Sequence, residues 1–242
     1  MKLRQAVSRT IAKIQKKICN FAAVNIVPPK SSKKHDWLPE PTLRRLPWYL
    51  AYLAILRRDG VEFVSSRGLA DALDVDASQI AKDLSHLGLR GKTRIGYEVV
   101  ALERELRGFL GFDVGHNAVI VGVGSLGGAL IQDRGLQRYG LNIVAGIDTN
   151  TDIVGTRAGG IVISGYEALA DIVSDHDVSV GILTVPARHA QDAADRLMDA
   201  GVRAIWNFTP TRIRVREGVV ITNTSIYSHL AVMYNRMDSA GQ

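Results

Sequence analysis

Three glycines carry the clearest chemical signal in this sequence. Gly122, Gly124 and Gly127 follow the apolar run Val119–Val121 at G-x-G-x-x-G spacing. In such a segment the first glycine permits a tight turn, the second lets backbone approach a pyrophosphate, and the third lets helix and strand pack closely. The N-terminus of the helix that follows stabilises phosphate charge. We therefore predict a phosphate-binding turn, with a purely structural turn between strand and helix as the alternative.

Asp148 stands where a dinucleotide would need a carboxylate. It directly follows a second predicted strand, Leu141–Ile147, and lies 21 residues beyond Gly127. A carboxylate near this position binds ribose hydroxyls and disfavours a 2′-phosphate, so NAD(H) is expected rather than NADP(H). The strand ends at Val185-Pro186 and Asn207–Pro210 should meet the same edge of a parallel sheet. The predicted cofactor site comprises Gly122, Val123, Gly124, Ser125, Leu126, Gly127, Asp148, Val185, Pro186, Asn207, Phe208, Thr209 and Pro210.

The elements that must position this site alternate between strands and helices. Further strands are expected at 160–163, 178–185, 204–208 and 219–222, with helices at 166–173 and 187–200. This alternation predicts an α/β fold with a Rossmann-like, doubly wound parallel sheet. An amphipathic helix over 226–237 closes the chain.

An enzyme is the less favoured interpretation of the sheet edge. A small oxidoreductase would need a proton donor beside the nicotinamide. Thr184, Asn207 and Thr209 stand at this edge, without a Tyr-Lys pair or metal ligands. His189 is the nearest histidine, and we expect it on an exposed helix turn.

The first folded segment after the N-terminus is a leucine-rich helix. Its leucines recur three or four residues apart, which predicts one buried face. Thr42 is the expected N-cap, and Gly60 ends the helix. Pro47 implies a kink or a start one turn later.

Two short helices and a hairpin follow, which together predict a winged helix-turn-helix. Ser65-Ser66 caps a helix over 67–73, and Asp76 caps a second over 77–87. Glycines within 88–97 predict a hairpin that forms a basic wing. A helix over 99–109 then leads to the glycine turn.

The outward-facing residues of this module are candidates for DNA contact. A protein-interaction module is the alternative, because the second short helix carries only one lysine. The predicted DNA-binding residues are Ser65, Ser66, Ser78, Gln79, Lys82, Ser85, His86, Arg90, Lys92 and Arg94.

The composition is that of an ordinary globular chain. Of 242 residues, 46% are hydrophobic, and no apolar run is long enough to span a bilayer. One cysteine, Cys19, excludes an internal disulfide framework and a cysteine metal site, and the six histidines lack ligand spacing. A reducing cytoplasm is the expected compartment.

The net charge of +6 belongs to the N-terminus. Residues 1–36 hold nine basic residues and one acid (+8), 37–110 hold eleven and ten (+1), and 111–242 hold ten and thirteen (−3). A nucleic-acid interface must therefore come from local pattern rather than from global charge. Three interpretations of the extension stay open: an amphipathic helix that contacts DNA or membrane, a transit peptide, or a segment of little role. We favour a flexible extension and linker.

Together these segments resemble the bacterial redox-sensing repressor family Rex. The resemblance implies a homodimer whose C-terminal helices swap between subunits, and a repressor that holds double-stranded operator DNA with NAD⁺ and releases it with NADH. It also implies DNA contacts by Gln79, Lys82 and Ser85 and by the wing near Lys92–Arg94. The matching segments, over about 39–235, are Pro39–Leu50, Gly60–Ser66, Gln79-Ile80, Lys82–Ser85, Gly96-Tyr97, Gly122–Gly127, Asp148, Val154-Gly155, Val185–Ala187, Ala190-Gln191, Ala200-Gly201 and Asn207–Pro210.

The implied organisation has four parts. They are an extension and linker (1–38), a winged-helix DNA-binding domain (39–110), a dinucleotide-binding domain (111–224) and a dimerisation helix with its tail (225–242).

The chain departs from the family pattern at functional positions. The resemblance places the redox switch on an arginine, a tyrosine and an aspartate, where this chain has Ala51, Asp133 and Ser225, so no arginine–aspartate bridge can form there. The recognition helix and wing also differ, at Ala81, His86-Leu87 and Gly91–Arg94. We therefore expect a divergent member that keeps dimerisation and nucleotide binding, with altered operator choice and altered or lost redox switching. The alternatives are a dimeric NAD(H)-binding scaffold without a DNA role and, less favoured, a small oxidoreductase.

Overall fold

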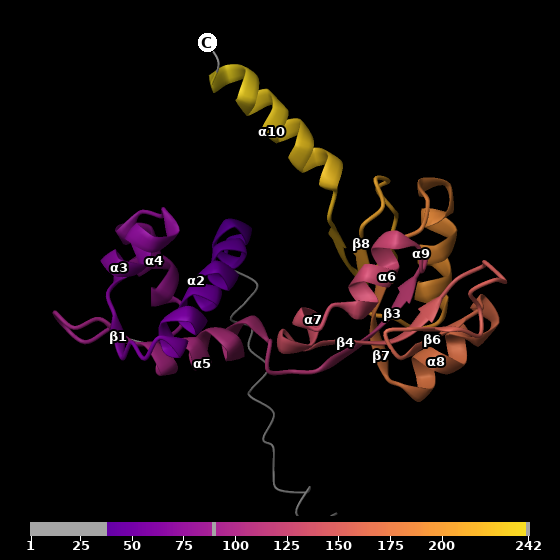
Figure 1. Cartoon of the computed structure of the whole chain (residues 1–242), viewed down its shortest axis with the longest axis horizontal. Coiled ribbons are helices and arrows are strands. Elements are labelled where there is room, and N and C mark those ends of the chain that lie inside the picture. Colours follow the sequence, from indigo (N-terminus) through magenta and orange to yellow (C-terminus); the bar gives the residue numbers. More distant parts are fainter. Residues whose placement is uncertain (1–37, 89–90, 241–242) are drawn as a thin grey trace, which may run out of the picture. The chain divides into compact units, whose positions relative to one another are not determined.

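The computed structural model describes residues 38–88 and 91–240 (Figure 1). Its internal contacts divide the chain into two units, residues 1–49 and 50–242. Arg90 and the basic extension lie outside the described residues, so the predictions made for them stay predictions.

The described part of the first unit is the start of helix α2 (Glu40–Arg58). The helix begins before Thr42 and continues through Pro47, so the predicted cap and the later start were wrong. Pro41 needs no amide partner in a first turn, and the amides of Thr42 and Leu43 bond to the Pro39 carbonyl. An interior proline costs about 3 kcal/mol. Full burial of side chains on both sides of Pro47, Leu46 and Tyr49, offsets a cost of that size.

The second unit opens with the rest of α2, which ends at Arg58, and Gly60 (φ +76°) follows in the turn that the sequence predicts there. The short helices are α3 (Ser66–Leu73) and α4 (Ala77–Ser85). Their predicted caps are confirmed: the Ser65 hydroxyl accepts from the amide of Gly68, and Asp76 accepts from the amide of Ser78. The apolar faces of the two helices are buried at Leu69, Ile80 and Leu84.

A small antiparallel pair completes the winged helix. Strand β1 (Phe63–Val64) pairs with β2 (Tyr97–Glu98), and a bridge between Lys92 and Gly96 closes the described part of the wing. Helix α5 (Val99–Leu110) follows.

The remaining strands form one seven-stranded sheet in the order β5-β6-β4-β3-β7-β8-β9. All neighbours are parallel except β5 and β6. In chain order the parallel strands therefore run 3-2-1-4-5-6, the Rossmann order, with the reversal between β3 and β7. The bounds are β3 (His116–Val121), β4 (Leu141–Ile147), β5 (Arg157–Ala158), β6 (Ile161–Ser164), β7 (Val178–Leu183), β8 (Ala204–Asn207) and β9 (Val220–Asn223).

Helices cover both faces of this sheet. Alternate residues of β3 point to opposite faces: Val119 and Val121 join the core under α8 (Leu169–Asp175) and α9 (Ala190–Asp199), and Ile120 joins the core under α6 (Ser125–Gln132). Short 3₁₀ turns, η1 (Tyr166–Ala168) and η2 (Ala187–His189), lead into α8 and α9. The sequence did not predict β5 or the four-residue helix α7 (Gly135–Arg138), because neither is long enough to show a period.

Helix α10 (Ile226–Ala240) closes the described chain. Of its residues 226–237, all except Leu230 are exposed. None of the helices in the described ranges is long and apolar enough to cross a membrane.

Candidate functional site

The glycine turn has the shape that its spacing predicts. Gly122 ends β3 with φ +94°, a conformation that favours glycine. A Cβ at Gly127 would lie 2.1 Å from the Gly122 carbonyl oxygen, so only glycine lets α6 approach the strand this closely. A Cβ at Gly124 would meet nothing within 4 Å. The backbone at Gly124 therefore faces open space, as a phosphate cradle requires.

The N-terminus of α6 lies at this open space. Gly124 is the N-cap, and no side chain of the described residues caps the helix there. Gly124, Ser125 and Leu126 are exposed, so the first amides of α6 are accessible to an anion. The turn therefore fits a bound pyrophosphate.

Asp148 lies against the turn. One carboxylate oxygen accepts from the amide of Val123 (2.6 Å), and the other accepts from the amide of Asn150 (2.9 Å). These two bonds fix the carboxylate beside the phosphate cradle with lone pairs left for a ligand. This is the position that a ribose-binding carboxylate needs.

A cavity of about 140 Å³ adjoins Asp148. Its lining includes the predicted site residues Gly122, Val185 and Pro186, whereas Asn207–Pro210 are not among the residues that line it. Five further residues line the cavity that were not among the predicted site residues, namely Ile147, Thr149, Tyr166, His189 and Asp192. Tyr166 was detectable, because it follows the end of β6 just as Asp148 follows β4. His189 lies on the exposed turn η2, as predicted.

The predicted site residues at the end of β8 hold the sheet edge together. Asn207 is fully buried; its amide nitrogen donates to the carbonyl of Thr211 and to Asn223, and its oxygen accepts from Thr209. These bonds occupy the amide of Asn207. Phe208 packs against Trp206 with ring centroids 4.6 Å apart, on the α6 face of the sheet.

The candidate DNA-binding residues of α4 differ in how they are held. Lys82 is exposed and forms no ion pair within the described residues. The Gln79 amide donates to Asp83 (2.8 Å), and the Ser85 hydroxyl donates to the Lys82 carbonyl (2.6 Å). Lys82 is therefore the side chain of this helix best placed to meet a phosphate or a base.

The N-terminus of α4 is capped by the carboxylate of Asp76. The hydroxyl of Ser78 and the amides of Ser78 and Gln79 donate to Asp76, and these bonds hold its pKa below the usual value. A charged cap stabilises the helix N-terminus. Of the predicted DNA-binding serines, Ser65 therefore caps α3 and Ser78 donates to the cap of α4. On the wing, the ammonium of Lys92 lies 5.0 Å from the centre of the Phe63 ring.

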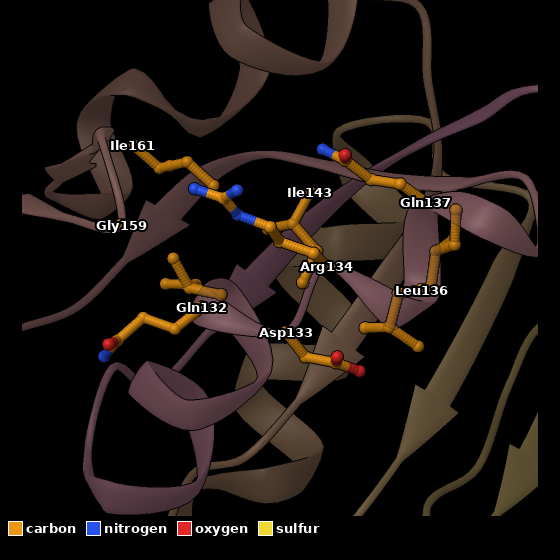
Figure 2. A pocket seen from close by; sticks show the side chains of 10 residues that line it. Gln132, Asp133, Arg134, Leu136, Gln137, Ile143, Gly159 and Ile161 are labelled. Carbon is orange, nitrogen blue, oxygen red and sulfur yellow. The ribbon is translucent and has the colours of Figure 1, made fainter.

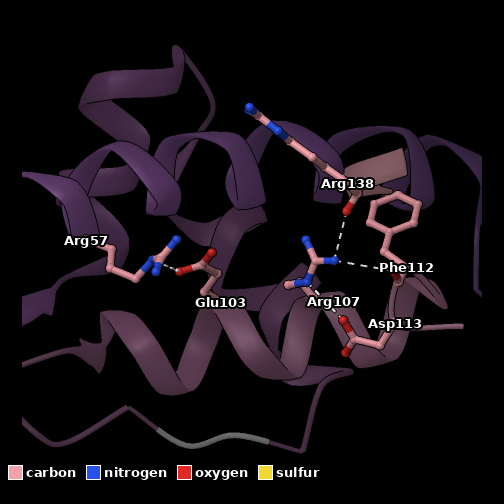
Figure 3. A network of polar contacts seen from close by, with 6 residues as sticks. All are labelled: Arg57, Glu103, Arg107, Phe112, Asp113 and Arg138. Carbon is pink, nitrogen blue, oxygen red and sulfur yellow. Dashed lines mark hydrogen bonds and ion pairs between the residues drawn. The ribbon is translucent and has the colours of Figure 1, made fainter. Parts of the chain in front are cut away.

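A polar network fastens α5 to the segments that follow it (Figure 3). The Arg107 guanidinium donates to Asp113 (2.9 Å) and to the carbonyl of Arg138, the last residue of α7 (2.8 Å). Arg57 of α2 pairs with Glu103 of α5 (2.7 Å). These bonds therefore hold α5 both to α2, which precedes it, and to the segments that follow it.

Asp133, at the position of the family's switch tyrosine, has a local role. It is the C-cap of α6, and its carboxylate accepts from the amide of Gly135 (2.7 Å), so that it holds the turn between α6 and α7. Beside it lies a cavity of about 410 Å³, which Arg134 crosses toward Ile161 (Figure 2). Ser225, at the position of the switch aspartate, accepts from the amide of Ser228 and starts α10.

These features define a class of protein: a winged helix joined to a Rossmann-type domain whose glycine turn has the shape of a phosphate-binding turn. A family model described as a putative DNA-binding protein N-terminus matches residues 38–85, and one described as a CoA binding domain matches residues 114–211.

Among relatives, the redox-sensing transcriptional repressor Rex of Porphyromonas gingivalis is 54% identical over 87% of this chain and 96% of its own. That of Bacteroides thetaiotaomicron is 52% identical, with 83% and 91% covered. The chain belongs to the Rex family of redox-sensing transcriptional repressors.

Solved structures agree. RSP, a Rex-family repressor crystallised with β-NAD⁺ and operator DNA, matches with a TM-score of 0.80 and 33% identity, covering 84% of this chain and 94% of its own. The same repressor with β-NADH matches at 0.76 and 32%, with 85% and 96% covered.

Proposed function

We propose that this protein is a DNA-binding transcriptional repressor that binds NAD(H) and responds to the NADH/NAD⁺ ratio in the cytoplasm. The observation that carries the proposal is the geometry of the glycine turn. The N-terminus of α6 is open, no residue larger than glycine fits at Gly127, and hydrogen bonds fix Asp148 beside the turn. The relatives' names and the RSP complexes with NAD⁺, NADH and operator DNA support it. None of these relatives is named as an enzyme.

The proposed function uses two sites, one that binds the dinucleotide and one that binds DNA. Gly122–Gly127 would hold the pyrophosphate, Asp148 a ribose, and the strand ends at Val185 and Asn207–Pro210 the rest of the dinucleotide. The operator would meet α4 through Lys82 and the wing through Lys92 and Arg94, with backbone phosphates fixing the register. The domain boundaries at 38, 110 and 224 belong to the same proposal.

The central test compares DNA binding with each nicotinamide form. Duplexes selected from a random pool with NAD⁺ present would serve as operator, and calorimetry would measure NAD⁺, NADH and NADPH affinity. We expect NADH to weaken DNA binding relative to NAD⁺, and NADPH to bind poorly because Asp148 repels a 2′-phosphate. Because Ala51, Asp133 and Ser225 replace the switch groups, the size of the NADH effect is the informative quantity.

The outcomes separate the alternatives. Equal DNA affinity with both forms would overturn redox sensing while leaving a repressor. Nucleotide affinity without any DNA selection would identify the scaffold. Absence of nucleotide affinity would overturn the cofactor site.

We further propose a homodimer formed through α10. Ile226, Leu230, Met233 and Met237 recur four, three and four residues apart, and Tyr227 and Tyr234 widen the same stripe. Apart from Leu230 these side chains are about half or more exposed, which is unusual for an apolar stripe in a folded protein. A second copy would cover it.

The substitution Met233→Glu places a charge in this stripe. We expect it to convert the protein to a monomer and to lower operator affinity at least about tenfold, because a dimer reads two half-sites together. Sedimentation and a gel shift would measure both effects. Ser228→Glu, on the opposite side of α10, is the matched control. A dimeric Met233→Glu protein with unchanged DNA affinity would contradict the proposed interface.

A further inference from the structure

The cavity beside Asp148 indicates which base the site accepts. This inference rests on the proposed NAD(H) function. In a dinucleotide the ribose joins the pyrophosphate to the base. Since the glycine turn suits the pyrophosphate and Asp148 suits the ribose, the base must lie beyond Asp148. The cavity of about 140 Å³ occupies that place, and its walls come from the ends of β3, β4, β6 and β7. The chemistry of these walls therefore decides base identity.

Tyr166 forms one wall. It lines this cavity and also an adjoining hollow of about 390 Å³, and both spaces share Asp148 and Thr149. The ring packs against the core under α8 and α9, and the Arg196 guanidinium lies 4.7 Å from its centre. Burial, and then the charge of Asp192, raise the pKa of Tyr166, so the phenol is neutral at pH 7. A fixed neutral ring is a suitable surface for a planar base.

Asp192 is one of the polar side chains that line the same cavity, together with Asp148, Thr149 and His189. One of its oxygens accepts from Arg196 Nε (2.9 Å), which holds the carboxylate in the first turn of α9. A carboxylate accepts hydrogen bonds and donates none. It therefore favours a purine with an amino group at C6 and opposes one with a carbonyl there.

We propose that Tyr166 and Asp192 form a base-recognition element that selects adenine, with the ring of Tyr166 as its wall and the carboxylate of Asp192 as the acceptor for the exocyclic amine. Arg196 contacts both side chains and sets their relative position. It is a positioning residue.

The test compares NAD⁺ with nicotinamide hypoxanthine dinucleotide, which carries a carbonyl in place of the amine. We expect the wild-type protein to bind the hypoxanthine form about tenfold more weakly, the loss of one hydrogen bond to a charged group. In Asp192→Asn the amide can turn its NH₂ toward the carbonyl, so the discrimination should fall to about twofold or less. Asp199→Asn, another arginine-paired acid of α9, should leave the discrimination unchanged.

Tyr166 is tested by ADP-ribose, which keeps the adenine end and lacks nicotinamide. Tyr166→Leu should weaken ADP-ribose and NAD⁺ by the same factor, and Tyr166→Phe should restore both. Wild-type protein that binds both dinucleotides equally would overturn the base-recognition element and leave the proposed function standing. Protein that binds neither NAD⁺ nor ADP-ribose would overturn the proposed function itself.

Discussion

Replacing Gly127 by alanine should greatly weaken dinucleotide binding. The added Cβ would lie 2.1 Å from the Gly122 carbonyl oxygen and 3.0 Å from the hydroxyl of Thr184, which itself donates to that carbonyl. Backbone cannot move aside as a flexible side chain does, so α6 must shift and its amides leave the phosphate position. The loss of two or three bonds to a charged group corresponds to a decrease in affinity of at least about 100-fold. Overpacking should also lower the free energy of unfolding by about 1–3 kcal/mol.

Gly128→Ala is the matched control one residue along the same helix. A Cβ there would meet nothing within 4 Å, and alanine stabilises a helix interior by about 1 kcal/mol relative to glycine. Its nucleotide affinity should stay within about twofold of wild type, with a higher melting temperature. Calorimetry with NADH and thermal melts would compare the two variants. Gly127→Ala protein with wild-type affinity would show that the turn is structural, the alternative that the spacing leaves open.

Replacing Lys82 by alanine should weaken operator binding about tenfold or more. Lys82 is exposed on α4, and the described residues offer it no ion pair, so its charge is available to DNA. Loss of a phosphate contact would weaken binding to every sequence alike and lower the salt slope by about one, whereas loss of a base contact would relax preference at one position. Gel shifts at several salt concentrations, with saturating NAD⁺, would distinguish the two.

The control for charge is Arg203→Ala. Arg203 is an exposed cation just before β8, in the nucleotide-binding fold, and its removal alters net charge equally. Operator affinity should change less than about twofold in that variant. Unchanged affinity in Lys82→Ala would exclude α4 as the recognition helix and favour a protein-interaction module.

Local sequence signals determined most of the architecture. The strands from β3 to β9 were predicted except β5, because buried parallel strands read as apolar β-branched runs. The caps at Ser65 and Asp76 were predicted because a cap is a bond between neighbours in the chain. Gly122 and Gly127 belong to the same class: their spacing in the chain already encodes the close contact of one helix with its own strand.

The sequence did not predict features that depend on contacts between residues far apart in the chain. The helix α2 passes through Pro47, against local preference, and it buries Leu46 and Tyr49 there. Arg107 was not singled out, because its partner is the carbonyl of Arg138, and a backbone carbonyl leaves no mark in the sequence. Asn207 was assigned to the cofactor site by its place at the sheet edge, whereas its amide is taken up by bonds within the loop and to Asn223.

The sequence by itself determined the glycine turn, the carboxylate that follows the next strand and the winged helix, because each rests on residue types at fixed short spacing. Only the tertiary structure decided what surrounds them. It brought Tyr166 and Asp192 to the cavity next to Asp148, from segments that follow β6 and β7. It also showed that Asp133 holds the turn between α6 and α7 and that Ser225 caps α10, at positions where the family resemblance implies a switch. Strand order and helix packing set these distances, and neither is written in local spacing.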